Sequence, residues 1–236
     1  KMKQQTKMRS SFTATHVTYD EEDPLGEAFA LFSLFPVFLV CSLSTLVAFN
    51  RDLRVCYVLL CLLLTTGGCS IVKRIVAQVF AEHTNHHLRP ETSELTSPGM
   101  PSNHSACSAY VAFFAILFAK RRLAHITSSR CYIRFVERLC LALATCVVSS
   151  MCAYSRVRLG HHTIPQVCVG LLYGSFMGIF SYIGYEFYFV TTLAPWIESF
   201  TILQQLGFHL PDDLHDAPQC NGIKHQRYEN KNEKSL

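Results

Sequence analysis

Two polar stretches of the sequence each contain an arginine and a histidine, and these residue types can act together on a phosphate group. The first stretch contains Arg89 and His104, and the second, SRVRLGHHTIPQ, contains Arg156 and His162. A guanidinium donates paired hydrogen bonds to phosphate oxygens, and an imidazole serves as acid, base or nucleophile near neutral pH. The sequence therefore predicts a site for phosphoryl transfer, provided that the fold brings the two stretches together.

The positive charge that such a reaction needs comes from side chains or from a metal ion. Ser102 and the backbone N–H groups at the start of the following helix can add hydrogen bonds to the same anion. The chain has no cluster of Asp or Glu with metal-ligand spacing, so we expect no metal and no other cofactor. His83, His86 and His87 offer imidazoles to a metal, but an exposed polar insert explains them more simply.

The elements that must position these stretches are predicted to be membrane-spanning helices. Half of the 236 residues are hydrophobic and 16% are charged, and the charges lie between apolar runs. Residues 28–49 carry no charge and are long enough to cross a hydrocarbon core of about 30 Å. Further apolar runs follow at 55–72, 105–119, 139–154 and 164–190. We therefore predict an all-α polytopic membrane helix bundle of about five transmembrane helices.

Positive charge predicts that both reactive stretches lie on one side of the membrane. The short loop Lys120–Arg138 holds six lysines and arginines, so the positive-inside rule places it in the cytoplasm. With five spans, the stretches around Arg89–His104 and Arg156–His162 then both face the lumen or the exterior. Anchoring at the membrane interface would explain any one of these residues alone, but it does not explain the matched set.

The remaining segments are expected to play supporting roles. Around a transmembrane domain at 28–190, residues 1–27 are predicted to be a flexible polar tail and 211–236 a polar C-terminal tail. Residues 191–210 are predicted to form an interfacial or re-entrant helix. The cysteines lie mostly in apolar runs without a C-x-x-C pair, which argues against a zinc site or a disulfide framework. The net charge of +4 is modest and spread out, so we expect no nucleic-acid partner.

Glycines recur every four residues in the last span, at Gly170, Gly174 and Gly178. This spacing places them on one helix face and is typical of close packing against a neighbouring helix.

The order of the motifs resembles the signature of the type 2 phosphatidic-acid phosphatase family. PSNH at 101–104 corresponds to its Pro-Ser-x-His motif, and SRVRLGHHTIPQ at 155–166 corresponds to Ser-Arg-x5-His-x3-Asp. The similarity covers most of the chain, from about 25 to 208. Spacing within the second motif selects His162 over His161, which would be a loop residue near the membrane surface.

The resemblance implies a role for each matching residue and a phosphatase activity for residues 28–190. His162 would be the nucleophile that forms a phosphohistidine, and His104 would be the acid that protonates the leaving group. The groups implied to bind phosphate are Arg156, Arg89, Ser102, Asn103 through its backbone N–H, and Lys73.

The sequence departs from the family pattern between Lys73 and Arg89. Fifteen residues lie between them, more than the first motif of the family has, and the additional residues centre on Ala81–His87. Either this insert loops out and Lys73 still reaches the site, or Arg74 takes its place. Downstream, Asn103 begins a formal glycosylation sequon, NHS, which we expect to be unused because a glycan there would block the site.

A glutamine, Gln166, stands where the family signature has an aspartate. Thr163 and Gln166 have the spacing of a capping box, which predicts that a helix begins there. The Gln166 carbonyl oxygen would accept a hydrogen bond from His162 Nδ1 and leave Nε2 free to attack. A carboxylate would also stabilise a positive imidazole, whereas an amide cannot, so we expect a less basic His162.

The resemblance is strongest to a subgroup that acts on polyprenyl diphosphates and that also has the glutamine. It implies a membrane enzyme of the endoplasmic reticulum that cleaves dolichyl diphosphate on the lumenal side, in support of dolichol recycling for N-glycosylation. Its partners would be the polyprenyl lipid substrate and the membrane.

One alternative is a lipid monophosphate phosphatase that acts on phosphatidate or a sphingoid-base phosphate. Another is a catalytically silent lipid-binding relative, which the presence of both histidines and both arginines disfavours.

Overall fold

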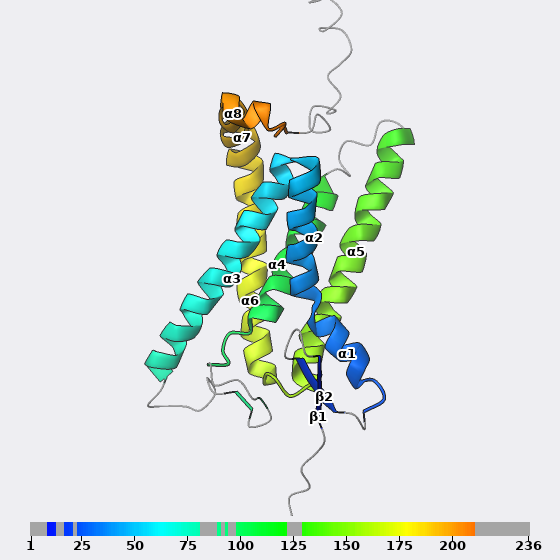
Figure 1. The fold of residues 1–236 in the computed structure, drawn as a ribbon, viewed down its shortest axis with the longest axis vertical. Coiled ribbons are helices and arrows are strands. Elements are labelled where there is room, and N and C mark those ends of the chain that lie inside the picture. Colours follow the sequence, from blue (N-terminus) through cyan, green and yellow to red (C-terminus); the bar gives the residue numbers. More distant parts are fainter. Residues whose placement is uncertain are drawn as a thin grey trace, which may run out of the picture.

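The apolar runs of the sequence form the long helices of the computed structural model, which describes residues 9–12, 17–20, 23–80, 89–90, 93, 98–121 and 129–210. The bundle consists of α2 (Phe35–Asn50), α3 (Leu53–Phe80), α4 (Asn103–Arg121), α5 (Ser129–Arg158) and α6 (Ile164–Gly184) (Figure 1). Beyond α6 the helix continues through a π-helical segment, η3 (Tyr185–Leu193), into α7 (Ala194–Glu198). The predicted all-α membrane bundle is confirmed.

The number of clearly membrane-spanning helices is lower than the five predicted. Among the described residues, three helices are long and apolar enough to cross a membrane, at Leu53–Val79, Val136–Arg158 and Ile164–Glu198. A fourth span results if α2 is joined to the short α1 (Gly26–Ser33), from which it is bent by 41°. The bend comes just before Pro36, whose ring cannot continue the hydrogen-bond ladder of a preceding helix.

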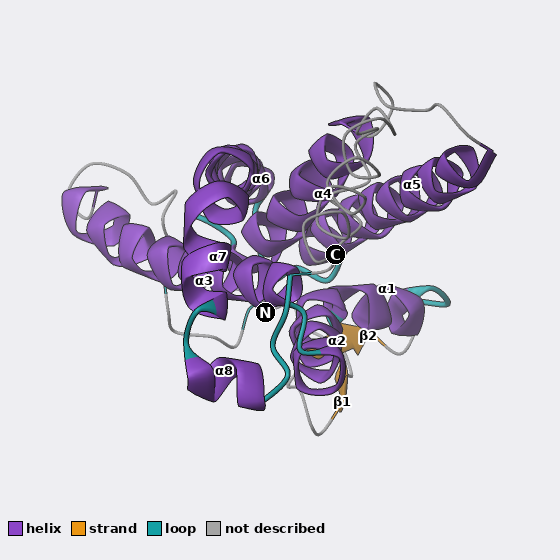
Figure 2. Ribbon diagram, turned by 90° about the horizontal axis from the view of Figure 1, so that it is seen from above, coloured by secondary structure: helices purple, strands orange, loops and turns teal. Residues whose placement is uncertain are grey.

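The fifth predicted span, 105–119, forms α4 but does not reach the hydropathy of the other spans. This helix lies between α5 and α6 when the bundle is viewed from above (Figure 2), and Ala106, Cys107 and Tyr110 on it are almost completely buried. Because α4 is covered by protein on several sides, it needs less apolar surface than a helix that faces lipid. A central position therefore explains why its sequence can hold buried serines such as Ser105 and Ser108.

The predicted glycine face of the last span packs directly against α4. A Cβ atom built on Gly174 would lie 2.0 Å from the carbonyl oxygen of Ala106, and one built on Gly170 would lie 2.6 Å from that of Ser102. No side chain fits at these distances, so the glycines allow the two helix backbones to touch. This contact fixes α6 relative to the start of α4.

Two short strands lie within residues 1–27, the segment predicted to be a flexible polar tail, and its flexibility stays a prediction. Within residues 1–27, β1 (Arg9–Phe12) and β2 (Val17–Asp20) pair as an antiparallel hairpin. Tyr19 of β2 packs against a cluster formed by α1 and the end of α5. The strands are short and mostly polar, so the sequence carried little periodicity to reveal them.

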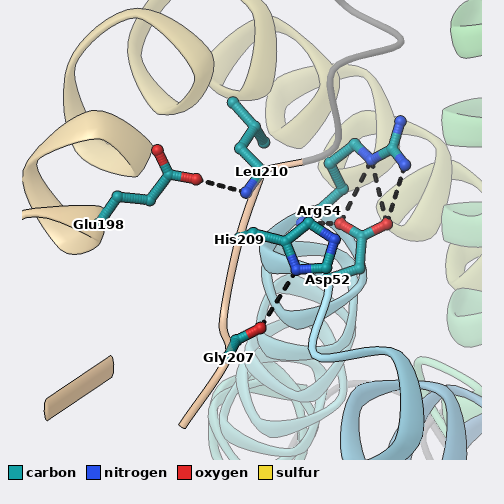
Figure 3. Close-up of polar contacts among 6 residues, drawn as sticks. All are labelled: Asp52, Arg54, Glu198, Gly207, His209 and Leu210. Carbon is teal, nitrogen blue, oxygen red and sulfur yellow. Dashed lines mark hydrogen bonds and ion pairs between the residues drawn. The ribbon is translucent and has the colours of Figure 1, made fainter. Parts of the chain in front are cut away.

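A second small structure closes the opposite end of the bundle. After α7, the short α8 (Thr201–Gln205) leads into a segment that pairs with the turn between α2 and α3 (Figure 3). His209 donates its N–H to the Arg51 carbonyl and accepts from Leu53 N–H, at 3.2 and 3.1 Å. Apolar side chains of this region, including Trp196 and Ile202, are exposed. We retain the interfacial placement of 191–210 as a proposal.

Candidate active site

The two reactive stretches of the sequence meet at a cavity of about 330 Å³. The cavity lies where α3 approaches its end, α4 begins and α5 ends, which is the lower end of the bundle in Figure 1. Its lining residues are Ser70, Lys73, Arg74, Arg89, Pro98, Asn103, His104, Arg156 and His162. The fold thus brings together both histidines and both arginines that the sequence analysis singled out, while the described ends of the basic loop Lys120–Arg138 lie at the other end of the bundle.

A tight turn after α5 places His162 in the cavity. The backbone N–H groups of His161 and His162 both donate to the Arg156 carbonyl, at 3.1 and 3.0 Å. Gly160 makes this turn possible because it adopts φ 71°, a left-handed conformation that suits glycine. The His162 side chain is only 3% exposed.

His161, in contrast, does not line the cavity, which agrees with the choice of His162. His161 lies in the loop between α5 and α6, as expected, but its side chain is only 4% exposed; its place near the membrane surface stays a prediction. Its carbonyl oxygen accepts a hydrogen bond from Arg89 Nη1 at 3.2 Å. His161 therefore helps to hold Arg89 through its backbone.

Gln166 orients the His162 ring as the sequence predicted. Its Oε1 atom lies 3.1 Å from His162 Nδ1 and also accepts from the Thr163 N–H at 3.3 Å, which is the predicted capping interaction. Because an amide oxygen only accepts, Nδ1 must carry the proton, and the Nε2 lone pair accepts a hydrogen bond from the Arg89 guanidinium, which a phosphate would displace. Nε2 lies 3.3 Å from Arg89 Nη1 and faces the cationic part of the cavity.

The electrostatic surroundings make His162 a weak base. Burial lowers its pKa to about 3, and the positive charges of Arg156 and Arg89 act in the same direction. The expectation that Gln166 makes His162 less basic than a carboxylate would is not tested by this low pKa and stays a prediction. The hydrogen bond to Gln166 raises the pKa, and burial outweighs it. His162 is therefore neutral at physiological pH and can act as a nucleophile.

The cations around His162 come from three separate segments, which are α3, the segment that contains Arg89, and the end of α5. α3 remains helical as far as Phe80, and this places both Lys73 and Arg74 on the cavity wall. The structure thus does not choose between these two residues as the first cation of the site. The insert Ala81–His87 lies outside the described residues, so its predicted exposure stays a prediction.

Ser102 is located differently from the other predicted phosphate-binding residues. It is completely buried, does not line the cavity, and its hydroxyl accepts a hydrogen bond from Ser105 Oγ at 3.2 Å. Its backbone N–H donates to the Gln166 carbonyl at 3.1 Å. In this structure Ser102 ties the start of α4 to the start of α6, and its contact with phosphate remains a prediction.

Asn103 contributes its side chain to the cavity wall. Its Nδ2 donates to Ser70 Oγ at 3.0 Å, so the nitrogen that a glycan would modify points into the protein wall. Ser70 was missed by the sequence analysis, although it lies three residues before Lys73 and thus on the same helix face.

Gly99, in the motif GMPSNHS, is also explained by the site. A Cβ atom on Gly99 would lie 2.6 Å from both terminal atoms of the Gln166 amide. Only glycine leaves room for the side chain that orients His162.

Comparison with protein families matches residues 54–189 to the PAP2 superfamily. The chain belongs to the PAP2 superfamily. Among curated PAP2 relatives, human dolichyldiphosphatase 1 is 32% identical over 167 residues, which cover 71% of this chain and 68% of that protein. Dolichyldiphosphatase of Saccharomyces cerevisiae is 28% identical over 71% of this chain and 66% of its own length. Lipid phosphate phosphatase gamma of Arabidopsis thaliana is 32% identical over 70% of this chain and 69% of its own length.

No solved structure gives a significant match. The superfamily match, its relatives and the apolar helices identify this PAP2 protein as a hydrolase and a multi-pass membrane lipid phosphatase. The resemblance seen in the motifs is confirmed.

Proposed function

We propose that the protein hydrolyses dolichyl diphosphate to dolichyl phosphate and inorganic phosphate, with His162 as the nucleophile. The observation that carries this proposal is the His162 ring, whose Nε2 lone pair faces a cavity lined by arginines while Gln166 holds Nδ1. A neutral imidazole in a fixed tautomer beside fixed positive charge is suited to attack phosphorus.

The reaction would take place in two steps. The anionic substrate favours the protonated form of His104 when it binds. His162 Nε2 then attacks the terminal phosphorus, the bond from phosphorus to the bridging oxygen breaks, and the protonated His104 gives its proton to the departing dolichyl phosphate. Water then attacks the phosphohistidine, His104 takes a proton from that water, and the phosphorus–nitrogen bond breaks to release inorganic phosphate. Both histidines return to their starting states, so the cycle is balanced without a redox partner.

The charges in the cavity favour a diphosphate over a monophosphate. Lys73, Arg74, Arg89 and Arg156 all line it, and among the residues that the structure describes no Asp or Glu does. A diphosphate carries more negative charge than a monophosphate, so it gains more from four cations. The dolichyldiphosphatase relatives support the same substrate.

We also propose that the cavity faces the lumen of the endoplasmic reticulum, where the product would enter dolichol recycling for N-glycosylation. The sequence Lys120–Arg138 is rich in lysine and arginine, and its described ends lie at the opposite end of the bundle, which supports this orientation through the positive-inside rule. In sealed reticulum vesicles, hydrolysis of an added water-soluble diphosphate analogue should then appear only after detergent opens the membrane.

Phosphate release from dolichyl diphosphate by the purified protein in detergent and EDTA tests the reaction. His162→Ala should abolish release, whereas His209→Ala, a matched change at the exposed opposite end, should leave it unchanged. Equal turnover of phosphatidate would favour the lipid monophosphate phosphatase. Turnover of neither lipid would favour the silent relative.

A further inference from the structure

A residue far from both motifs contacts the phosphate-binding arginine. Arg156 Nη1 donates a hydrogen bond to the Oγ of Ser33, which lies 123 positions away in the sequence, at the end of α1. Ser33 is completely buried and Arg156 is only 4% exposed. Ser33 also lies outside residues 54–189, the part that matches the PAP2 superfamily.

A second nitrogen of the Arg156 guanidinium has no acceptor in the described part of the structure. Its Nε atom is buried and has no hydrogen-bond partner among the described residues. The same side chain lines the cavity that holds His162. A buried donor of this kind is unfavourable unless an acceptor arrives, and a phosphate oxygen is such an acceptor.

The end of α1 is held firmly against α5. Phe29, Ala30 and Leu34 form an apolar cluster with Leu159, which follows Arg156 by less than one helical turn. An ion pair between Asp23 and Arg158, 3.1 Å long, joins the same two segments. Ser33 lies between Ala30 and Leu34 of this cluster, so its hydroxyl has a fixed place relative to Arg156.

We propose that Ser33 is a positioning residue that fixes the Arg156 guanidinium for phosphate binding. An arginine side chain loses much conformational freedom when it binds an anion, and a preformed hydrogen bond at Nη1 removes part of that loss beforehand. The inference rests on the proposed function only in that Arg156 binds the phosphate; the identity of the lipid does not matter to it.

Vanadate, an analogue of phosphate, gives a test that is independent of the lipid. A hydrogen bond to a charged group makes a difference of about tenfold to a hundredfold in affinity. Ser33→Ala should therefore raise the inhibition constant for vanadate, and the KM for substrate, by about that factor. Ser33→Thr, which keeps the hydroxyl, should recover most of the loss.

Two matched variants separate positioning from structural damage. Arg158→Gln breaks the ion pair to Asp23 but leaves Ser33 in place, and it should keep vanadate affinity near the wild-type value. Arg156→Ala removes the group on which Ser33 acts, so adding Ser33→Ala to it should have no further effect on vanadate inhibition or residual turnover.

Several results would overturn the proposal. The first is a Ser33→Ala variant that binds vanadate as tightly as the wild type. The second is an Arg158→Gln variant that loses as much vanadate affinity as Ser33→Ala. The third is a Ser33→Ala change that lowers vanadate affinity by the same factor in the Arg156→Ala background as in the wild type. If Ser33→Ala does not fold, Ser33→Cys keeps the volume with a much weaker acceptor and is interpreted in the same way. A wild-type protein that binds vanadate in a Ser33-dependent manner but ignores dolichyl diphosphate would refute the proposed substrate alone.

Discussion

Replacement of Gln166 by glutamate should shift the pH dependence of catalysis and leave the geometry of the site nearly unchanged. The two side chains have the same size, and the site is tight, because Gly99 lies directly against the amide. Glutamate keeps an oxygen as acceptor for His162 Nδ1 and for the Thr163 N–H. The main change is a full negative charge about 3.1 Å from the imidazole.

The size of the shift follows from competing effects. At that distance, with an effective dielectric constant of about 20, the attraction between the carboxylate and a protonated His162 is about 5 kcal/mol. Part of it is lost because the buried carboxylate is itself desolvated and is attracted to Arg89 and Arg156. A neighbouring opposite charge typically changes a pKa by about one to three pH units. The pKa of His162, about 3 in the wild type, should therefore rise to between about 4 and 6.

The sign of the effect on activity is determined by the nucleophile, which must be unprotonated. Protonation of His162 should leave the wild-type kcat/KM unaffected down to about pH 4, whereas the Gln166→Glu variant should lose up to about tenfold between pH 7 and pH 5. Dividing the variant profile by the wild-type profile removes the ionisation of the substrate, which is common to both. A ratio that does not change from pH 7 to pH 4 would refute the assigned hydrogen bond between Gln166 and the nucleophile.

Three further predictions concern packing, modification and charge. Gly174→Leu should push α4 and α6 apart and lower the free energy of unfolding in detergent by at least about 1–3 kcal/mol. Gly67→Ala should leave it unchanged, because nothing lies within 4 Å of the added methyl group. Equal melting temperatures for the two variants would contradict the packing described. Asn103 should show no mobility shift on endoglycosidase treatment of active enzyme, and a glycan there would be incompatible with its place in the cavity wall. Lys73→Met should lower kcat/KM by about tenfold or more, with Lys73→Arg close to wild type. A larger loss in Arg74→Met would assign the role of first cation to Arg74.

The parts of the site that sequence analysis predicted depend on short-range spacing. His162 and Gln166 are four residues apart, and a helix that begins at Ile164 brings them close together once the turn at Gly160 has formed. The apolar runs likewise predict the helices, because membrane insertion depends on local composition. Ser33 could not be predicted in this way, because its contact with Arg156 depends on how α1 lies across α5.

The discrepancies have the same origin. The burial of His161 and the position of Ser102 behind the cavity are set by packing between helices, which no local pattern encodes. The lower hydropathy of α4, the helix at the predicted span 105–119, has a related reason. Hydrophobicity reports contact with lipid, and α4 has exchanged much of that contact for contact with protein.

The hydrogen bond from Ser102 N–H to the Gln166 carbonyl has a consequence for the biogenesis of the protein. A nascent chain enters the membrane from its N-terminus, so α3 and α4 are in place before α6 has been synthesised. Until α6 docks on α4 through its glycine face, the cationic wall with Lys73 has no oriented nucleophile opposite it, because Gln166 arrives with α6. Under the proposed mechanism, a chain in which α6 has not yet docked therefore cannot hydrolyse its substrate, and activity appears only once α4 and α6 are in contact.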